Sequence, residues 1–408
     1  MTPVARLGGG WIASAHGNVS TTSPLFVLIL VFQDQIVPRL TVGAVVGQHV
    51  ETGNLDRSTA DVHTRNKAVI EALRRTMVDF DADRVRAALR DALSPDAVVH
   101  MPHPFGDLSG PEDLYATCYA PLFDAMPDLE RRDWIVVGGQ TEDGQDWIGC
   151  GGHYIGTFIG PWLDIPPTGH LTHMRFHEFY RFEEGRVIEV QTLWDIPEVM
   201  MQANAWPMAP SLGREICIPG PATSDGIVPG PWDEARARAS CEHIVTMLTY
   251  MKRHPSQGGP EVMEMPRFWS DRVNWYGPAG IGTARGIAGF RNWHQIPFIN
   301  GMPDRGQYVD EITYHFFGDG DYAAVTGWPN MIQTVTHDGW MGIAPSGKRI
   351  TMKSLDFWRI ENGKIRENWV MVDILDAYAQ IGVDVFARLR EFNKTRVPGR
   401  LPFPIEDR

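Results

Sequence analysis

The stretch Ile165–Asp195, IPPTGHLTHMRFHEFYRFEEGRVIEVQTLWD, sets the architecture of the whole chain. It predicts a Pro-Gly turn followed by two strands, with Glu184-Gly185 as the tight turn between them, because glycine accepts the positive φ that such a turn needs. The stretch Ile343–Asp373, IAPSGKRITMKSLDFWRIENGKIRENWVMVD, repeats the turn glycines and the terminal aspartate 178 positions later (373 − 195 = 178). Equal spacing of the same turn residues indicates a tandem repeat.

The segments with helical periodicity and the segments with strand-like alternation follow one another in the same order in both copies. In the first copy the pattern predicts helices over residues 61–93, a short strand at 97–101, a helix from 110 to 126 and then a run of antiparallel strands. A Pro- and Gly-rich linker follows. The predicted boundaries are an unassigned extension at 1–58, a first domain at 59–206, the linker at 207–230, a second domain at 231–392 and a tail at 393–408. Each domain is expected to be an α+β unit, with helices on one face of a curved antiparallel sheet.

Composition excludes some partners. The formal net charge of -13 disfavours nucleic acid, whose phosphates would be repelled, and gives no attraction to a membrane surface. The apolar run at 25–32 is too short to span a bilayer, so we interpret residues 1–58 as an extension that is partly disordered or forms a lone edge strand. The four cysteines are scattered without a CxxC pair, which is typical of reduced thiols in a cytoplasmic protein.

The aspartate that ends each repeated hairpin is the first candidate for chemistry. Alternate residues of a strand share a face, so Gln191, Leu193 and Asp195 project together, as do Trp369, Met371 and Asp373. Such an acid is either a solvated residue at the rim of the sheet or a carboxyl inside a pocket. In a pocket, desolvation would raise its pKa and allow proton transfer near neutral pH.

Histidines are concentrated in the first copy. His173 and His177 are expected on one face of a strand together with Arg175, as proton-transfer partners of Asp195 or as metal ligands. Their spacing falls on a strand and not on the helix of a metalloprotease-type site, so we expect no metal. The second copy has Trp328, Thr351 and Leu355 at the positions of His153, His173 and His177, which makes the first copy the better equipped for catalysis.

Two further patterns have ordinary explanations beside functional ones. The run Gly149–Gly152 lacks the spacing of a phosphate-binding loop. Cys150 is either a nucleophile paired with His153 or an apolar filler. The tryptophans are core residues, or line a cavity for a flat apolar ligand. The side chains expected to contact a substrate are His100, His153, Gln191, Trp194, Trp328 and Trp369.

Together these segments resemble the SnoaL-like polyketide cyclase family, part of the nuclear transport factor two-like superfamily. The resemblance is carried by Gly152–Gly160, by the IPPTG turn, by Phe179–Val187 and by Trp194-Asp195, with counterparts at Gly342–Lys348, Trp358–Ile365 and Asp373. It implies a cone-shaped α+β fold around an apolar pocket, and aldol chemistry without a cofactor. It also implies that Asp195 and Asp373 act as acid/base. Members of the superfamily commonly pair through their sheets, so the two copies are expected to form that pair within one chain, and a homodimer of the chain is a further option.

The function expected from the sequence is therefore that of a cyclase, isomerase or lyase. It would act on a small apolar carbonyl compound through Asp195 with His173 or His177, and Asp373 would act in the second copy. A hydrolase or dehydratase in which the Asp–His pair activates water is the alternative within catalysis. A binding protein for a small ligand is the alternative outside it, because fold does not fix function.

Overall fold

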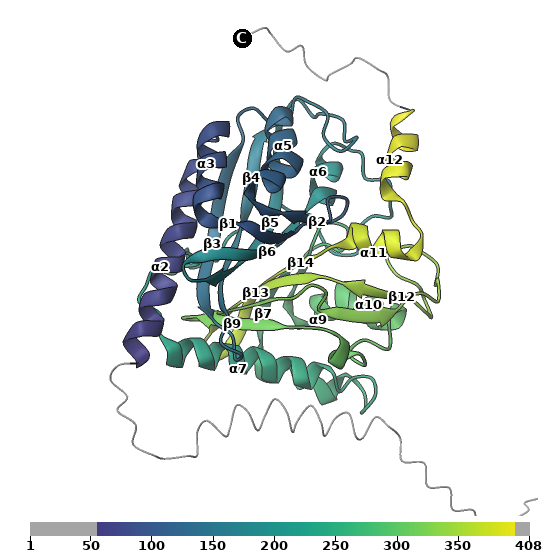
Figure 1. The fold of residues 1–408 in the computed structure, drawn as a ribbon. Helices are drawn as coiled ribbons and strands as arrows, with labels where there is room; N and C mark the ends of the chain where they lie inside the picture. The colour runs from purple at the N-terminus through teal and green to yellow at the C-terminus, as the bar shows by residue number, and fades with distance from the viewer. Residues whose placement is uncertain (1–54, 396–408) are drawn as a thin grey trace, which may run out of the picture. The chain divides into compact units, whose positions relative to one another are not determined.

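The computed structural model describes residues 55–395. The predicted extension, apart from its last few residues, and nearly all of the predicted tail lie outside the described residues. The first unit contains α2 (Leu55–Thr76), α3 (Ala82–Ala92), β1 (Leu93–His100), β2 (Asp107–Ser109), α4 (Gly110–Leu114), the π-helix η1 (Tyr115–Tyr119), α5 (Ala120–Ala125), β3 (Glu130–Gln140), β4 (Asp146–Thr157), β5 (Leu171–Glu183), β6 (Arg186–Trp194) and α6 (Ile196–Gln202) (Figure 1).

The second unit repeats this order after the linker. It contains α7 (Glu234–Met251), the 3₁₀-helix η2 (Pro260–Met263), α8 (Met265–Phe268), β7 (Trp269–Tyr276), β8 (Ala284–Arg285), α9 (Gly286–Phe290), the π-helix η3 (Arg291–Gln295), α10 (Ile296–Gly301), the 3₁₀-helix η4 (Val309–Glu311), β9 (His315–Asp319), β10 (Tyr322–Thr326), β11 (Met331–Thr334), β12 (Arg349–Met352), β13 (Ser354–Glu361), β14 (Lys364–Val372), α11 (Ile374–Ile381) and α12 (Val385–Asn393). No helix of residues 55–395 is long and apolar enough to cross a membrane.

The two sheets have the same strand order. It is β2-β1-β6-β5-β4-β3 in the first unit and β8-β7-β14-β13-β10-β9 in the second, and β11 and β12 form a separate two-stranded sheet. In each sheet one pair is parallel, β1 with β6 and β7 with β14, and the other pairs are antiparallel. This repeated α+β order confirms the predicted tandem fold.

Local sequence explains where the elements begin and turn. Asp81 and Asp233 cap α3 and α7, because each side chain accepts a hydrogen bond from a backbone N–H of the first helical turn. In the repeated hairpin turns, Glu184 and Gly185 have φ of 48° and 78°, and Asn362 and Gly363 have 52° and 69°. Two consecutive positive φ values define the type I′ turn that a two-residue hairpin favours, which is why the sequence places glycine there.

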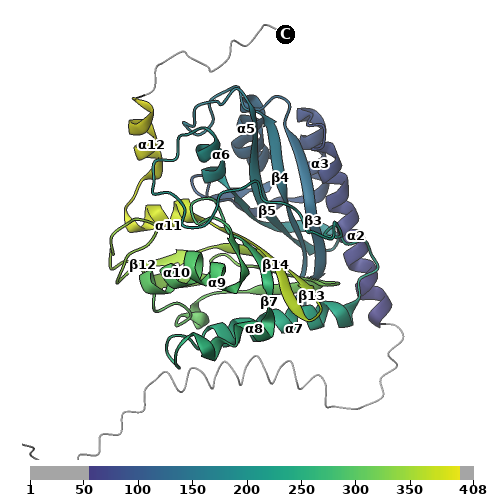
Figure 2. The same cartoon turned by 180° about the vertical axis from the view of Figure 1, so that it is seen from behind.

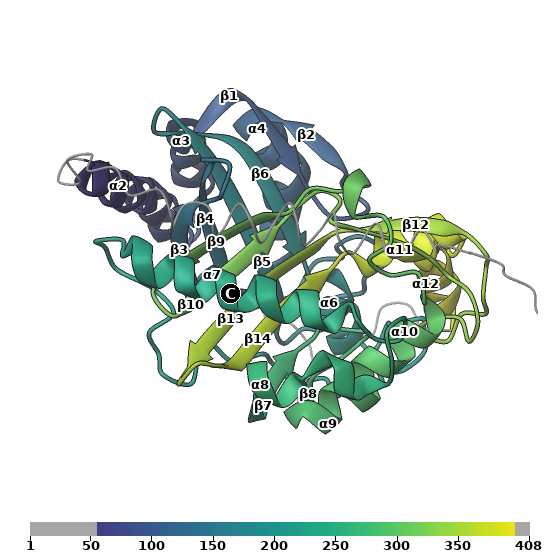
Figure 3. The same ribbon diagram turned by 90° about the horizontal axis from the view of Figure 1, so that it is seen from below.

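The sheets cover each other on one face and helices cover the other. In Figures 1 and 2, α2, α3 and α5 lie against the first sheet, and Figure 3 shows α7 crossing the second sheet near β9 and β10. A separate apolar cluster fills the space between the two sheets. Its buried members come from both units: Ile135, Val137, Trp147, Phe179, Leu193, Ile218, Tyr276, Phe317, Tyr322, Ala324, Leu355, Phe357, Trp369 and Met371.

Glycines of β4 make this close packing feasible. A Cβ atom at Gly149 would lie 2.8 Å from Cε1 of Phe357, and one at Gly151 would lie 3.3 Å from Cε2 of the same ring. Phe357 itself stacks on Phe179, with ring centroids 5.1 Å apart. The glycine run that lacks phosphate-loop spacing therefore serves the contact between the two units.

Candidate functional site

Both strand-terminal aspartates are buried at the contact between the units. Asp195 Oδ2 accepts hydrogen bonds from the backbone N–H of Ala279 at 3.0 Å and from Arg175 Nη2 at 3.3 Å. Asp373 Oδ2 accepts one from the backbone N–H of His103 at 3.1 Å and lies 3.5 Å from Lys353 Nζ. Each carboxylate thus binds a backbone amide of the opposite unit.

These contacts are related by the internal repeat. Ala279 and His103 are 176 positions apart (279 − 103), and the cations Arg175 and Lys353 are 178 apart (353 − 175), like the aspartates. The two contacts are therefore equivalent by the repeat, and each consists of an aspartate, a cationic side chain and a backbone amide of the other unit. Recurrence of the aspartate consequently has a structural explanation in addition to the predicted catalytic one.

The Arg175 side chain joins the units more extensively than its aspartate does. Its guanidinium is fully buried and donates to the carbonyl oxygens of Tyr276 at 3.2 Å, Gly277 at 2.8 Å and Val370 at 3.1 Å, all in the second unit. Burial raises the pKa of Asp195 to about 7, against the opposing charge of Arg175, and the nearby Glu198 carboxylate raises it further. A carboxyl with that pKa can exchange a proton at neutral pH, although its Oδ2 is already occupied.

Most of the other predicted residues face the second unit. His177 is fully buried between the sheets, with Nδ1 2.6 Å from the carbonyl oxygen of Leu355, and burial together with the Arg175 charge holds its pKa well below the usual range. Gln191 accepts a hydrogen bond from Thr326 Oγ1. His100 stacks on Trp328, with centroids 5.4 Å apart, and Trp369 Nε1 donates to the carbonyl oxygen of Pro219 in the linker. Asp195 and His177 thus have different hydrogen-bond partners.

His173 and His153 do come together, with two residues that sequence reasoning left out. His173 Nδ1 lies 3.2 Å from Glu198 Oε1, and the imidazole rings of His153 and His173 are 5.5 Å apart, edge to face. One potential ligand atom each from His153, His173 and Cys217 lie within 4.8 Å of one another. This is the one cluster of residues 55–395 with a geometry that could hold a metal ion. Cys150 is elsewhere, fully buried, and burial raises its thiol pKa to about 12, which fits an apolar filler.

The opposite, helix-facing side of the first sheet carries a buried polar network centred on Glu178. The carboxylate accepts hydrogen bonds from Arg131 Nη1 at 2.6 Å, from the hydroxyls of Tyr154 at 2.9 Å and Tyr180 at 2.6 Å, and from Trp194 Nε1 at 3.2 Å. Trp194 is the predicted contact residue that does face the interior. All of these side chains are buried, so this network is closed to solvent and is satisfied within the protein.

The corresponding position of the second unit is Asp356, 178 residues after Glu178 (356 − 178). Ser354 Oγ donates to Asp356 Oδ1 at 2.7 Å, and burial raises the pKa of this carboxyl to about 7, with the Arg305 charge opposing the rise. Asp356 and Arg305 are only half-buried, in contrast to Glu178 and Arg131.

Aromatic rings surround this second interior. His294, from the π-helix η3, stacks on Trp275 with centroids 4.1 Å apart and also contacts Phe290 and Phe298. Burial lowers the pKa of His294 to about 3, so its ring is neutral. Arg305 lies over the Phe298 ring, 5.4 Å from its centroid. The π-helix η1 occupies the equivalent place in the first unit, and π-helical turns are frequent at functional sites.

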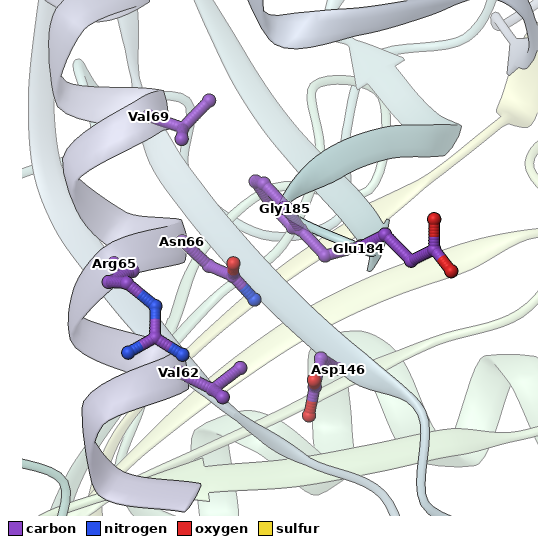
Figure 4. A pocket seen from close by; sticks show the side chains of 8 residues that line it. Val62, Arg65, Asn66, Val69, Asp146, Glu184 and Gly185 are labelled. Carbon is purple, nitrogen blue, oxygen red and sulfur yellow. The ribbon is translucent and has the colours of Figure 1, made fainter. Parts of the chain in front are cut away.

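A hollow of about 550 Å³ lies elsewhere, between α2 and the β5–β6 turn (Figure 4). It is lined by Val62, Arg65, Asn66, Val69, Asp146, Phe182, Glu184 and Gly185. None of the residues predicted to be catalytic or to contact a substrate lines it.

Sequence comparison identifies the family. The family description SnoaL-like polyketide cyclase matches residues 71–203 and 261–381, which together make up more than half of the chain. No curated protein sequence matches significantly.

Each similar solved structure matches little more than a third of this chain. One, assigned as a SnoaL-like polyketide cyclase from Jannaschia sp. CCS1, is 22% identical with a TM-score of 0.31, and the match covers 39% of this chain and 99% of that one. Another, IdmH from Streptomyces antibioticus, assigned as a polyketide cyclase, is 21% identical with a TM-score of 0.29, over 34% of this chain and 98% of that one. The chain described here belongs to the SnoaL-like polyketide cyclase family and contains two copies of its domain in tandem.

Proposed function

We propose that this protein is an enzyme that moves protons on a small, largely apolar carbonyl compound without a cofactor, as a cyclase, isomerase or lyase, and that Asp356 in the second unit is its acid/base. The observation that carries the proposal is the environment of this carboxyl. Burial raises the Asp356 pKa to about 7, with the Arg305 charge nearby, yet Asp356 keeps accessible surface. A carboxyl whose pKa is shifted by its surroundings and that still has exposed surface is a candidate to meet a ligand.

The roles follow from charge and position. As a carboxylate, Asp356 would take an acidic proton next to the carbonyl of the substrate, and as a neutral carboxyl it would return a proton later in the reaction. Arg305 would supply the positive charge that stabilises the developing enolate oxygen, because an arginine side chain keeps its proton in proteins. The rings of Trp275, Phe290 and Phe298 would exclude water and contact the apolar part of the substrate.

The assignment to Asp195 with His173 or His177 stays a prediction, and one observation favours it: the Asp195 pKa is also raised to about 7. However, Asp195 is 3% exposed and is held by Arg175 and Ala279, so it has less access to a substrate than Asp356.

The two assignments are separated by proton exchange. The purified chain would be incubated in D₂O with a panel of small 1,3-diketones, and deuterium incorporation next to the carbonyls would be followed by ¹H NMR. We expect Asp356→Asn to lower the catalysed exchange rate by ~10²-fold or more, the usual contribution of a general acid/base. Asp321→Asn, at an aspartate in the β9–β10 turn whose side chain is 45% exposed, is the matched control and should leave the rate unchanged.

Three other outcomes of the exchange experiment would each favour a different assignment. A folded Asp195→Asn variant that loses exchange while Asp356→Asn keeps it would move the acid/base to the first unit. Binding of a diketone without exchange would favour a non-catalytic binding protein. Loss of water from the substrate, or hydrolysis of it, in place of exchange would favour the dehydratase or hydrolase alternative.

A further inference from the structure

The cluster of His173, Glu198 and Cys217 is not part of the proposed proton-transfer site. We propose that Cys217 is a nucleophilic thiol, with His173 as its proton acceptor and Glu198 as the group that orients His173, and that this site is acylated by an activated acyl compound such as an ester or thioester. The side chains come from three segments: β5, the first turn of α6, and the linker between the units.

The local structure fixes the imidazole. Glu198 Oε1 lies 3.2 Å from His173 Nδ1, while Glu198 Oε2 accepts a hydrogen bond from the backbone N–H of Arg175 at 2.6 Å. Gln202 holds the His173 backbone on both sides: its Oε1 accepts from the His173 N–H at 3.0 Å and its Nε2 donates to the His173 carbonyl oxygen at 2.6 Å. A nucleophile, a base and a carboxylate that orients the base are the parts of a thiol-dependent catalytic triad.

The charges around His173 favour its protonated form. Burial lowers the pKa of His173, but the nearby Cys217 and Glu198 outweigh it and raise the pKa to about 10. Other titratable or charged groups nearby are His153, Arg175 and Asp195, with Arg175 opposing a second positive charge here. A base next to a thiol can take the thiol proton, and the thiolate that remains is the reactive form.

An independent observation points to a ligand at the same place. His153 is 5% exposed, its Nδ1 accepts a hydrogen bond from Trp134 Nε1 at 3.2 Å, and its Nε2 is buried without a partner. Burial lowers the His153 pKa to about 4, so the ring is neutral and carries its single proton on Nε2. This leaves an unused N–H donor in the cluster, the type of group that stabilises an oxyanion.

The proposed reaction consumes only the acyl compound and water. Cys217 gives its proton to His173, its sulfur attacks the acyl carbon, and the carbonyl oxygen becomes an oxyanion that accepts a hydrogen bond from His153 Nε2. The bond to the leaving group then breaks, and the leaving group takes the proton from His173. The acyl group stays on sulfur until water hydrolyses the new thioester, returning a proton to Cys217.

The second unit has the same backbone arrangement but no imidazole at the position of His173. Thr351 stands at the position of His173, and Gln380 holds its backbone as Gln202 does that of His173, with Gln380 Oε1 accepting from the Thr351 N–H at 2.9 Å. The backbone arrangement is therefore a property of the fold, whereas the thiol, imidazole and carboxylate set belongs to the first unit and the linker.

The test measures the pH dependence of Cys217 reactivity in the full chain. Iodoacetamide labelling would be located by mass spectrometry between pH 5.5 and 9, with Cys241, half-buried, as the internal control. In the wild type we expect the labelling rate at pH 6 to be ~10-fold or more above that of His173→Gln, whose profile should follow an ordinary thiol with a pKa of about 8.5. Glu198→Gln should lie between them.

A second measurement does not depend on any variant folding. p-Nitrophenyl acetate should give a burst of one p-nitrophenolate per chain and an acetyl group on Cys217. Equal pH profiles for the wild type and a folded His173→Gln would overturn the proposal, and so would the absence of an acetyl adduct. Submicromolar 1:1 binding of Zn²⁺, added alone and abolished by His153→Gln and Cys217→Ser, would overturn it in favour of a metal site.

Discussion

Replacing Arg175 by methionine should destabilise the whole described unit, because this one side chain satisfies four acceptors at the contact between the two copies. Methionine keeps much of the volume but leaves the carbonyl oxygens of Tyr276, Gly277 and Val370 without that donor, and Asp195 without its cation. Breaking a buried ion pair by removing one partner costs about 3–5 kcal/mol. We therefore expect the free energy of unfolding to fall by about 4 kcal/mol.

The repeat provides a matched control. Lys353 has the equivalent place, but its side chain is 16% exposed and lies 3.5 Å from Asp373 and 2.7 Å from Asp376. Within residues 55–395, Lys353 has no hydrogen bonds to backbone carbonyls like those of Arg175. Lys353→Met should therefore cost only about 1 kcal/mol. Urea unfolding at pH 7, followed by tryptophan fluorescence, measures both values.

A double-mutant cycle completes this test. Arg175→Met with Asp195→Asn should cost less than the sum of the two single changes, because removing both charges leaves neither one buried alone. The reasoning is refuted if Arg175→Met lowers the free energy of unfolding by less than 1 kcal/mol, or by no more than Lys353→Met does.

Three further predictions concern other parts of the structure. Gly149→Ala should lower stability by about 1–3 kcal/mol, since the new methyl would lie 2.8 Å from the Phe357 ring. Gly144→Ala is the control, because the space around its Cβ is open and only the cost of its positive φ should appear. Thermal unfolding of the two variants measures the difference. The raised Asp356 pKa means that the folded state binds this proton more tightly than the unfolded state, so its contribution to stability should decrease by about 1.4 kcal/mol per pH unit from pH 4 to 7. Urea unfolding of the wild type and Asp356→Asn across that range should show this slope in the difference between their stabilities. A difference that does not change with pH would contradict the raised pKa. Glu178→Gln should lower stability by about 1–3 kcal/mol, because it breaks the charged bond from buried Arg131, and equal stability of the variant would contradict a structural role for this network.

Much of the fold could be predicted because its signals are local. The positive φ of Gly185 and Gly363 follows from the turn they occupy, and equal spacing of these turns identified the repeat without any tertiary information. The strand order could not be obtained in this way, because pairing of β1 with the distant, parallel β6 depends on long-range packing.

The location of the site was harder to predict because both faces of β5 are buried. Alternation places His173, Arg175 and His177 on one face and Phe176, Glu178 and Tyr180 on the other, but it does not tell which face meets the helices. The second copy covers a face that would otherwise meet solvent, so both faces have apolar and polar buried residues. One sequence signal was available: Glu178 and Asp356 have the same separation as the strand-terminal aspartates.

Cys217 could not have been placed from the sequence. It lies in the linker, outside either repeat, and meets His173 only because the linker crosses back over the contact between the sheets, where Ile218 is part of the shared apolar cluster. Periodicity and spacing describe elements within a unit, and they contain no information about where an irregular segment packs.

The pH profile of catalysed deuterium exchange tests most directly whether Asp356 transfers the proton. We predict that kcat/KM for an exchanging diketone rises with an inflection near pH 7 in the wild type, where this carboxyl loses its proton, and that the inflection disappears in Asp356→Asn together with most of the rate. An Asp356→Asn protein that keeps both the rate and the inflection would contradict the assignment.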